Sequence, residues 1–288
     1  MTAVAGQDTP VALICGGGSL PLTVADSIAA HGREVLLFPL YGAASPSCFE
    51  ARPHHWLYYG QGGKFERLAH EAGCRDVVFI GSLVRPALWQ IRPDWRTLRY
   101  MPRIIAAYRG GDDHLLKSVG RLFEENGFRL VGAHEVAPEI LVPKGTLGSI
   151  APNERDRADI EFGLEYLSAS SAFDIGQAVV VADKHVLAVE AAEGTDAMIL
   201  RIAEMRASGR VRAPRGTGVL VKAPKRGQDK RFDLPSIGPQ TVAGAERAGL
   251  AGIAVAAGSS IVAEPERLVA AADRARIFVV GVPAAGGQ

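Results

Sequence analysis

Residues 11–30 read VALICGGGSLPLTVADSIAA, in which a short apolar run is followed by a glycine cluster and a segment of helical character. Pro21 suits the first turn of a helix, and Gly32 suits its end. The alternation continues with strand candidates at 34–40 and 76–81 and helix candidates at 64–72 and 113–126. Short apolar runs separated by helices predict a parallel sheet that is covered by helices on both faces.

The second half of the chain returns to this alternation after an irregular stretch. Residues 138–153, PEILVPKGTLGSIAPN, contain three prolines and two glycines. Such punctuation predicts a linker between domains. We therefore expect an α/β protein of two domains, with boundaries at 1–137 and 154–288.

Composition and charge narrow the class of protein. Hydrophobic residues make up 48% of the 288 residues and charged residues 22%, which is typical of a globular protein. No apolar run approaches the roughly 18 residues of a membrane helix, and the N-terminus lacks the features of a secretory signal. Three cysteines without a CxxC pair favour a reduced cytosolic chain.

The net charge of +1 conceals two basic segments. Residues 85–109 have a local balance of +5, and residues 210–231 have a local balance of +7. Basic residues gathered in two short segments of a neutral chain suit a compact anion better than a long nucleic acid.

The glycine cluster after the first strand is a candidate phosphate site. Gly17, Gly18, Ser19 and Leu20 lie where a strand passes into a helix, and a helix N-terminus offers free N–H groups to an anion. The dinucleotide fingerprint needs Gly or Ala at position 21, where this chain has proline, and it needs an acidic residue after the second strand. A phosphate or nucleotide contact without an NAD site is therefore expected; a tight turn without ligand is the alternative.

Two further glycine-containing loops lie in the first domain, one before a helix and one at the end of a strand. Gly60 and Gln61 lie in a glycine-rich loop beside tyrosines that could stack on a base, and an unliganded connection explains this loop equally well. Gly81 and Ser82 end the third strand, at the edge where open sheets bind ligands. Asp112 belongs to a pair of carboxylates that could hold magnesium, although a helix N-cap is the favoured interpretation.

An amphipathic pattern covers residues 95–105. Aromatic and aliphatic side chains face one way and arginines face another, with Pro102 as an interruption. This composition is found in helices that lie at membrane interfaces. A helix that faces the core and exposes solvated arginines is the favoured alternative.

The second half carries the densest polar cluster. Gln177 and Glu190 bracket a predicted hairpin, and Glu193, Gly194, Thr195 and Asp196 follow at the start of a helix. A loop then holds Lys222, Lys225, Gln228, Asp229 and Asp233. Cations in such a loop could clamp a diphosphate while a carboxylate holds Mg²⁺ or orients water; a solvated loop is the alternative. The sequence contains no HExxH, CxxC or GxSxG pattern.

Four stretches resemble a known family: CGGGSLPLTVADS at 15–27, GDDHLLKSVG at 111–120, FDIGQAVVVADKHVLAVEAAEGTDAMI at 173–199 and LVKAPKRGQDKRFDLPSIGPQTV at 220–242. They look like the UDP-2,3-diacylglucosamine diphosphatases of the LpxI type, enzymes of lipid A biosynthesis. The resemblance implies a Rossmann-like nucleotide-binding domain at 1–137, a lipid- and sugar-phosphate-binding domain at 154–288, and an active site in the cleft between them.

The resemblance also implies the chemistry. UDP-2,3-diacylglucosamine would be hydrolysed with Mg²⁺ to UMP and 2,3-diacylglucosamine 1-phosphate, by attack of water on the sugar-side phosphorus. The essential aspartate falls on Asp229, with Asp233 as competitor, and Lys222 and Lys225 are the expected catalytic cations. Metal ligation is expected from Glu193, Asp196 and Asp229. The enzyme would be cytoplasmic and peripheral at the inner membrane, with a homodimer as an expected assembly.

Two other expectations complete this interpretation. The small residues of AGLAGIAVAAGSSIVA, among them Ala254 and Ala256, are expected to line a groove for the acyl chains. The competing functions are an NAD(P)-dependent oxidoreductase, which Pro21 and the missing ribose acid oppose, and a nucleotide-sugar binding protein without catalysis.

Overall fold

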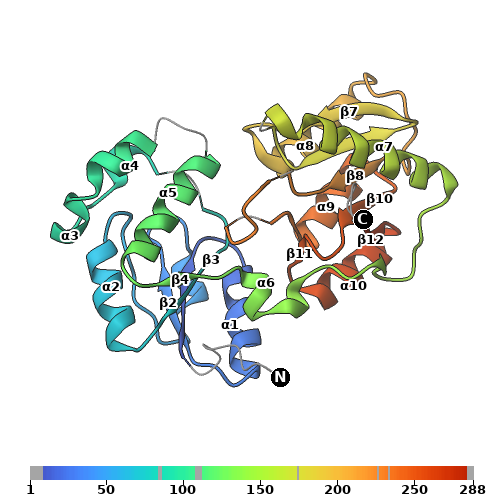
Figure 1. Ribbon diagram of the computed structural model, residues 1–288. Coiled ribbons are helices and arrows are strands. Elements are labelled where there is room, and N and C mark those ends of the chain that lie inside the picture. The colour runs from blue at the N-terminus through green and yellow to red at the C-terminus, as the bar shows by residue number, and fades with distance from the viewer. Residues whose placement is uncertain are drawn as a thin grey trace. The chain divides into compact units, whose positions relative to one another are not determined.

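The computed structural model describes residues 9–83, 86–107, 112–173, 175–225, 227–232 and 234–283. Within these ranges the side chains of Leu88 and of residues 112–114 are also left undescribed. The chain forms two compact units (Figure 1). The first comprises residues up to Glu139 together with 229–233, and the second comprises 140–228 and 234–288. The expectation of a two-domain α/β protein is confirmed.

The first unit is built on a four-stranded parallel sheet of order β2-β1-β3-β4. Its strands are β1 Val11–Cys15, β2 Val35–Pro39, β3 Asp76–Ile80 and β4 Arg129–Leu130. Its helices are α1 Leu20–Ala30, α2 Gly62–Glu71, α3 Trp95–Leu98, α4 Met101–Ala107, α5 Asp112–Glu125 and α6 Ala133–Val136, with short 3₁₀ turns at Pro46–Cys48, Leu88–Gln90 and Pro138–Ile140. Every residue of β1 and β3 is buried, which explains why both strands read as unbroken apolar runs apart from Asp76.

Asp76 opens β3 with its side chain only 1% exposed. Arg33 Nη2 donates to its Oδ2 at 2.8 Å, and Arg129 Nε donates to its Oδ1 at 2.8 Å. Burial opposes ionisation of Asp76, but the bonds from Arg129 and Arg33 outweigh it and lower the pKa of this carboxyl. The ion pairs therefore tie the loop before β2 and the strand β4 to the centre of the sheet.

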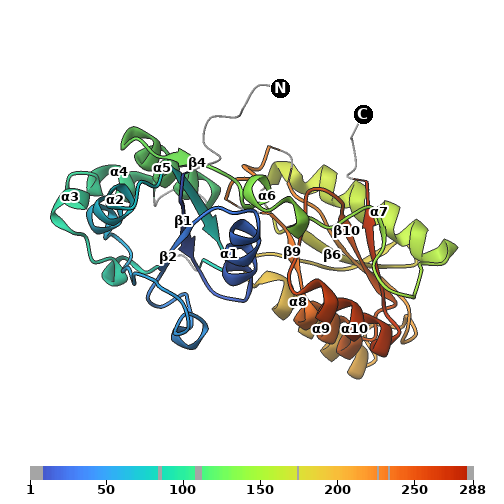
Figure 2. The same ribbon diagram turned by 90° about the horizontal axis from the view of Figure 1, so that it is seen from below.

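The second unit is a mixed sheet of order β5-β12-β10-β8-β6-β7. Its strands are β5 Gly145–Thr146, β6 Ala178–Ala182, β7 His185–Val189, β8 Val219–Lys222, β10 Gly252–Ala256 and β12 Phe278–Val282, and β9 Ser236–Ile237 pairs separately with β11 Ile261–Val262. The central strands β8, β10 and β12 are parallel, and β5, β6 and β7 are attached in antiparallel fashion. The helix α7 Glu154–Ser170 covers one face, and α8 Gly194–Ala207, α9 Pro239–Ala248 and α10 Pro265–Ala275 cover the other (Figure 2); a 3₁₀ turn at Ser171–Phe173 follows α7.

Two sequence expectations change here. Residues 138–153 are not a free linker, because β5 lies within them and residues 140–153 belong to the second unit. Ala254 and Ala256 are 0% exposed in β10, between β8 and β12, so the expectation that they line a groove for acyl chains is wrong. No helix among the described residues is both long and apolar enough to cross a membrane.

Candidate functional site

The glycine cluster of residues 16–18 packs against the end of β3. Gly17 N donates to Ser82 O and Ser82 N donates to Gly17 O, both at 2.9 Å. An added Cβ at Gly16 would lie 2.4 Å from Ser82 O, so the close approach of these loops requires a glycine there. The Gly17 N–H is therefore already used by the fold.

The remaining members of this predicted site lie at the start of α1. Gly18 has φ +89° with open space around it, and Ser19 precedes the helix without a side-chain capping bond. Leu20 is the first helical residue, and Pro21 removes one N–H donor from this turn. Gly18, Ser19 and Leu20 thus stay at a helix N-terminus beside Gly81 and Ser82, at the carboxyl edge of the parallel sheet.

The second glycine loop, Gly60 to Gly63, does not offer the same donors. Asp94 Oδ2 accepts the Lys64 N–H at 2.9 Å, and Thr97 Oγ1 accepts the Gly62 N–H at 3.1 Å. The N-terminus of α2 is capped by the chain's own oxygen atoms, and Gln61 Oε1 accepts the Tyr58 N–H at 3.0 Å. The N–H groups of Gly62 and Lys64 are therefore used within the fold.

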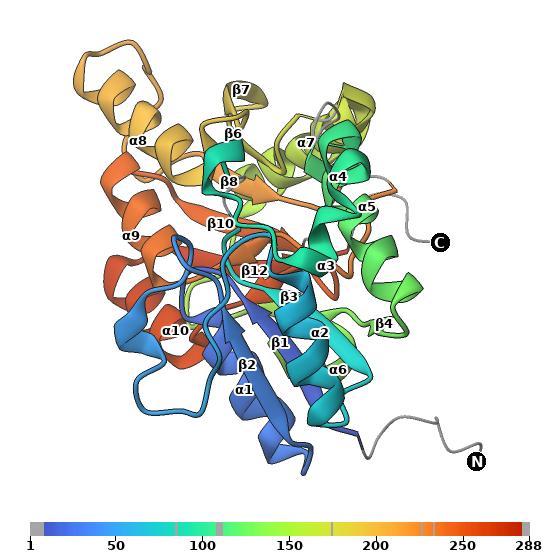
Figure 3. The ribbon, with the colours of Figure 1, turned by 90° about the vertical axis from the view of Figure 1, so that its left-hand side faces the viewer.

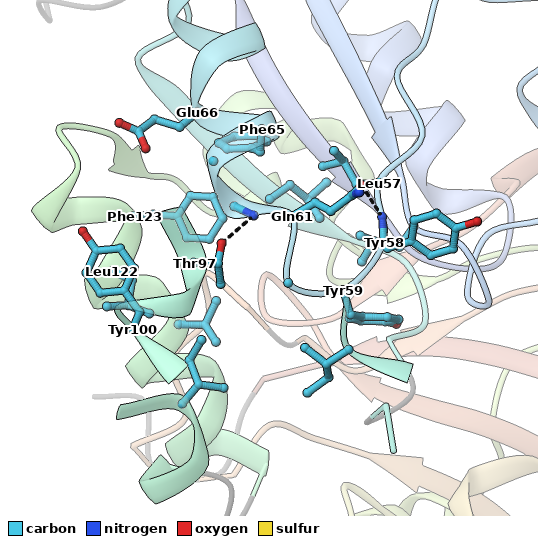
Figure 4. Close-up of a pocket in the computed structure, with 18 of the residues that line it drawn as sticks. Leu57, Tyr58, Tyr59, Gln61, Phe65, Glu66, Thr97, Tyr100, Leu122 and Phe123 are labelled. Carbon is cyan, nitrogen blue, oxygen red and sulfur yellow. Dashed lines mark hydrogen bonds between the residues drawn. The ribbon is translucent and has the colours of Figure 1, made fainter. Parts of the chain in front are cut away.

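Gly60 and Gln61 instead line an apolar pocket of about 290 Å³ in the first unit (Figure 4). The wall combines side chains from β1, β3, α2, α4 and α5, chiefly Ile14, Phe65, Phe79, Ile104, Leu115, Val119 and Phe123. Gln61, Glu66, Arg96, Thr97 and Asn126 are among the residues that bring polar atoms to the lining. A cavity near the lower end of the size range for small-molecule sites, with few polar groups, suits hydrocarbon.

The sequence gives no local signal for this pocket. Phe65, Phe79 and Phe123 come from three different elements, and their rings meet edge to face at 5.1 Å and 5.3 Å. Each aromatic residue by itself reads as an ordinary core position. Only the packing of α2, β3 and α5 turns them into one wall.

Asp229 belongs to the first unit, although it lies in the second half of the sequence. Its anchor is Phe232, whose ring lies 5.6 Å from that of Phe79 and against the backbone of α5 at Gly120. Residues 229–232, which the sequence places in a domain at 154–288, therefore pack with the first unit. Asp233, the competing catalytic candidate, lies outside the described residues.

The Asp229 carboxylate is held by Arg231. Arg231 Nε donates to Oδ1 at 3.0 Å and Nη2 donates to Oδ2 at 2.8 Å, while Nη1 donates to Glu124 Oε1 at 2.9 Å. These bonds from Arg231 lower the pKa of Asp229. An ionised, oriented carboxylate of this kind is a weak proton acceptor, and it suits charge stabilisation or cation binding better than general-base catalysis.

In the second unit, Lys222, Thr195, Glu190 and Gln177 form one chain of hydrogen bonds. Lys222 is 7% exposed, and its Nζ donates to Thr195 Oγ1 and to Ser236 O, both at 3.0 Å. Thr195 Oγ1 donates to Glu190 Oε1 at 2.7 Å, and Gln177 N donates to Glu190 Oε2 at 2.8 Å. The predicted cluster is thus assembled at the start of α8, where Gly194 and Asp196 also lie.

The other predicted residues divide between the two units. Arg201 Nη2 donates to Glu193 Oε1 at 2.9 Å. Lys225 and Gln228 close a turn, in which Gln228 Oε1 accepts the Lys225 N–H at 2.9 Å. Asp112 begins α5, and its side chain is not described.

The predicted metal ligands do not share one unit. Glu193 and Asp196 belong to the second unit and Asp229 to the first. Within the described ranges, no three His, Cys, Asp or Glu side chains gather closely enough to hold a metal ion. The described side chains of either unit therefore form no ready-made metal cage.

The chain matches two family models in tandem. The LpxI N-terminal domain matches residues 10–140, and the LpxI C-terminal domain matches residues 143–280. The UDP-2,3-diacylglucosamine pyrophosphatase LpxI of Caulobacter vibrioides is 44% identical over 270 residues, which cover 94% of this chain and 96% of that protein. The boundary between the models agrees with the division of the structure at residues 139 and 140. The chain therefore belongs to the LpxI family.

Proposed function

We propose that this protein hydrolyses UDP-2,3-diacylglucosamine to UMP and 2,3-diacylglucosamine 1-phosphate. The 44% identical relative carries this substrate in its name, and both LpxI domain models match. Neither competing function is favoured, because Pro21 breaks the dinucleotide fingerprint and a relative named as a pyrophosphatase argues against binding without catalysis.

A single observation carries the proposal. The ring of Phe79 lines the apolar pocket and also packs against Phe232, three residues from Asp229. A polar segment with an ionised carboxylate therefore adjoins a cavity suited to hydrocarbon. A substrate that joins a diphosphate to acyl chains needs both environments close together.

The pocket is the proposed site for an acyl chain, in place of the groove expected around Ala254. Its apolar wall would stabilise methylene groups by about 0.8 kcal/mol each. The nucleotide phosphate is assigned to Gly18, Ser19 and Leu20, where the N-terminus of α1 meets the end of β3. The proposal retains a Rossmann-like, nucleotide-binding role for the first unit and a reaction in the cleft between the two domains.

Hydrolysis would proceed by attack of water on the sugar-side phosphorus, with cleavage of its bond to the bridging oxygen and release of UMP. Lys222 and Lys225 would stabilise negative charge on the phosphoryl oxygens, and Asp229 would fix the position of a cationic or water partner. Thr195 and Glu190 position the Lys222 ammonium group, because they belong to its hydrogen-bond chain.

Mg²⁺ is part of the proposal. Magnesium in phosphoryl-transfer sites is commonly held by one or two carboxylates, the substrate phosphates and water. Such a magnesium site needs only one or two protein carboxylates, so it does not require a group of three ligands, and the described side chains form none. Asp229 and Asp196 are the carboxylates we assign to it. Action at the cytoplasmic face of the inner membrane and a homodimer remain predictions.

The test is release of UMP from UDP-2,3-diacylglucosamine by the purified protein with Mg²⁺, and with EDTA in its place. We expect Asp229→Asn to lose nearly all activity, while Asp183→Asn keeps it, because Asp183 is an exposed partner of Arg155. In ¹⁸O-labelled water the label should enter the lipid phosphate. Full activity of Asp229→Asn, or label in UMP, would overturn the roles assigned here.

A further inference from the structure

Two tryptophans of the first unit are more exposed than any other large hydrophobic side chain that the structure describes. Trp89 is 86% exposed and Trp95 is 84% exposed. Leu98 and Ile105, in α3 and α4, are also exposed, although the sequence favoured a helix that faces the core. Figure 3 shows α4 beside α5, and α3 beside α2. Exposed apolar side chains are normally scattered singly over a protein surface. Several of them in one short segment indicate a binding surface.

The charge of this segment is mainly positive. Residues 89–105 contain four arginines and one acid, Asp94. The Asp94 carboxylate is turned inward, since it accepts the N–H groups of Lys64 and Thr97. Arg96 and Arg103 pair with Glu66 and Glu125; Arg92 and Arg99 are exposed.

Arg92 and Arg99 each lie near an aromatic ring. The Arg92 Cζ atom is 4.2 Å from the Tyr58 ring centroid, and that of Arg99 is 5.5 Å from the Tyr100 centroid. A ring face directs a guanidinium group without neutralising its charge. These two arginines therefore present positive charge in the same short segment as the exposed tryptophans.

The inner side of the same segment belongs to the apolar pocket. Ile91, Tyr100 and Ile104 line that cavity, whereas Trp89 and Trp95 do not. One short piece of chain thus separates the pocket from an exposed apolar and basic surface.

We propose that residues 89–105 are a docking surface for an anionic lipid bilayer, with Trp89 and Trp95 at the level of the headgroups and Arg92 and Arg99 on the lipid phosphates. Tryptophan is favoured at this interface because its ring is apolar and its N–H is polar. A second copy of the chain is a poorer occupant, because a two-fold contact would place arginines against arginines. The choice of lipid rests on the proposed function, since a diacylated substrate resides in a bilayer.

The experiment measures flotation of the full chain with vesicles in the absence of nucleotide sugar. Vesicles of phosphatidylcholine are compared with vesicles that also contain about 30 mol% phosphatidylglycerol. The double variant Trp89→Ser/Trp95→Ser is expected to bind the anionic vesicles about tenfold or more weakly. Arg92→Gln/Arg99→Gln should lose the preference for anionic vesicles. Phe173→Ser, an exposed aromatic residue of the second unit, is the matched control and should bind as wild type does.

The tryptophan variant should hydrolyse detergent-dispersed substrate as fast as the wild type does. Its hydrolysis of substrate in vesicles should be slower, in proportion to its weaker vesicle binding. Wild-type protein that does not float, or a tryptophan variant that floats equally well, overturns the docking surface and leaves the hydrolase activity standing. A tryptophan variant that changes only the sedimenting mass of the protein would assign the patch to a contact between copies.

Discussion

The substitution Gly120→Ala should move Asp229 out of its position while it changes the free energy of unfolding only slightly. Gly120 lies inside α5, where alanine is favoured over glycine by about 1 kcal/mol. An added Cβ would, however, lie 2.5 Å from Phe232 Cζ and 2.7 Å from Leu130 Cδ1. Since ordinary contact needs roughly 3.5 Å, the Phe232 ring has to leave its place against Phe79.

The magnitude follows from these opposing effects. Overpacking of this kind raises the free energy of the form with Phe232 docked by about 1–3 kcal/mol. A cost of about 1.4 kcal/mol to the docked form relative to the released form corresponds to a tenfold change in their ratio. The helix gain is the same in both forms, so it offsets the lost Phe232 contacts only in the free energy of unfolding. We therefore expect UMP release to fall about tenfold at saturating substrate, with the free energy of unfolding of the first unit changed by less than about 1 kcal/mol.

The assay compares UMP release with urea unfolding for four proteins. Gly244→Ala, in α9 of the second unit, is the matched helical control. Its added Cβ would lie 3.3 Å from Ile199 Cγ2, so a shift of a few tenths of an ångström is enough to accommodate it. The double variant Gly120→Ala/Phe232→Leu should regain activity, since leucine is shorter than phenylalanine. Full activity of Gly120→Ala would refute the claim that Phe232 positions Asp229, and so would a double variant that is no better than the single one.

Three further predictions concern charge and the pocket. Arg231 lowers the pKa of Asp229, so in Arg231→Gln the acid limb of kcat/KM should move to higher pH; a limb that does not move would contradict the pairing. The Asp76 carboxyl has a lowered pKa, and its contribution to stability is present above its ordinary value of 3.8 and lost as pH falls through the lower folded value. Asp76→Asn removes the charge that accepts the bonds from Arg33 and Arg129, and hydrogen bonds to charged groups contribute about 2 kcal/mol. The variant should therefore have a lower free energy of unfolding at pH 7 and a smaller fall in acid, as chemical denaturation would show. Val119→Trp should fill the apolar pocket and lower kcat/KM for the diacyl substrate more than for a short-acyl analogue, and equal losses would exclude an acyl site there.

Much of the fold follows from local sequence. The predicted strand 34–40 is observed as Val35–Pro39, and the predicted helix 113–126 as Asp112–Glu125. These elements were predictable because a buried strand and a helix that ends at glycine have short-range signatures. The hydrogen-bond chain of Glu190, Thr195 and Lys222 was foreseen only as a cluster of polar residues, because its partners come from different strands and a helix start.

The sequence by itself determined the order of strands and helices, the parallel sheet and the small set of polar residues at the loops. The tertiary structure decided three things about their use. The Asp94 carboxylate accepts an N–H group at the N-terminus of α2. Phe65, Phe79 and Phe123 line one apolar pocket. Asp229 belongs to the first unit, where Phe232 packs against Phe79. All three depend on contacts between residues far apart in the chain, whose formation depends on packing and loop closure rather than on local propensity.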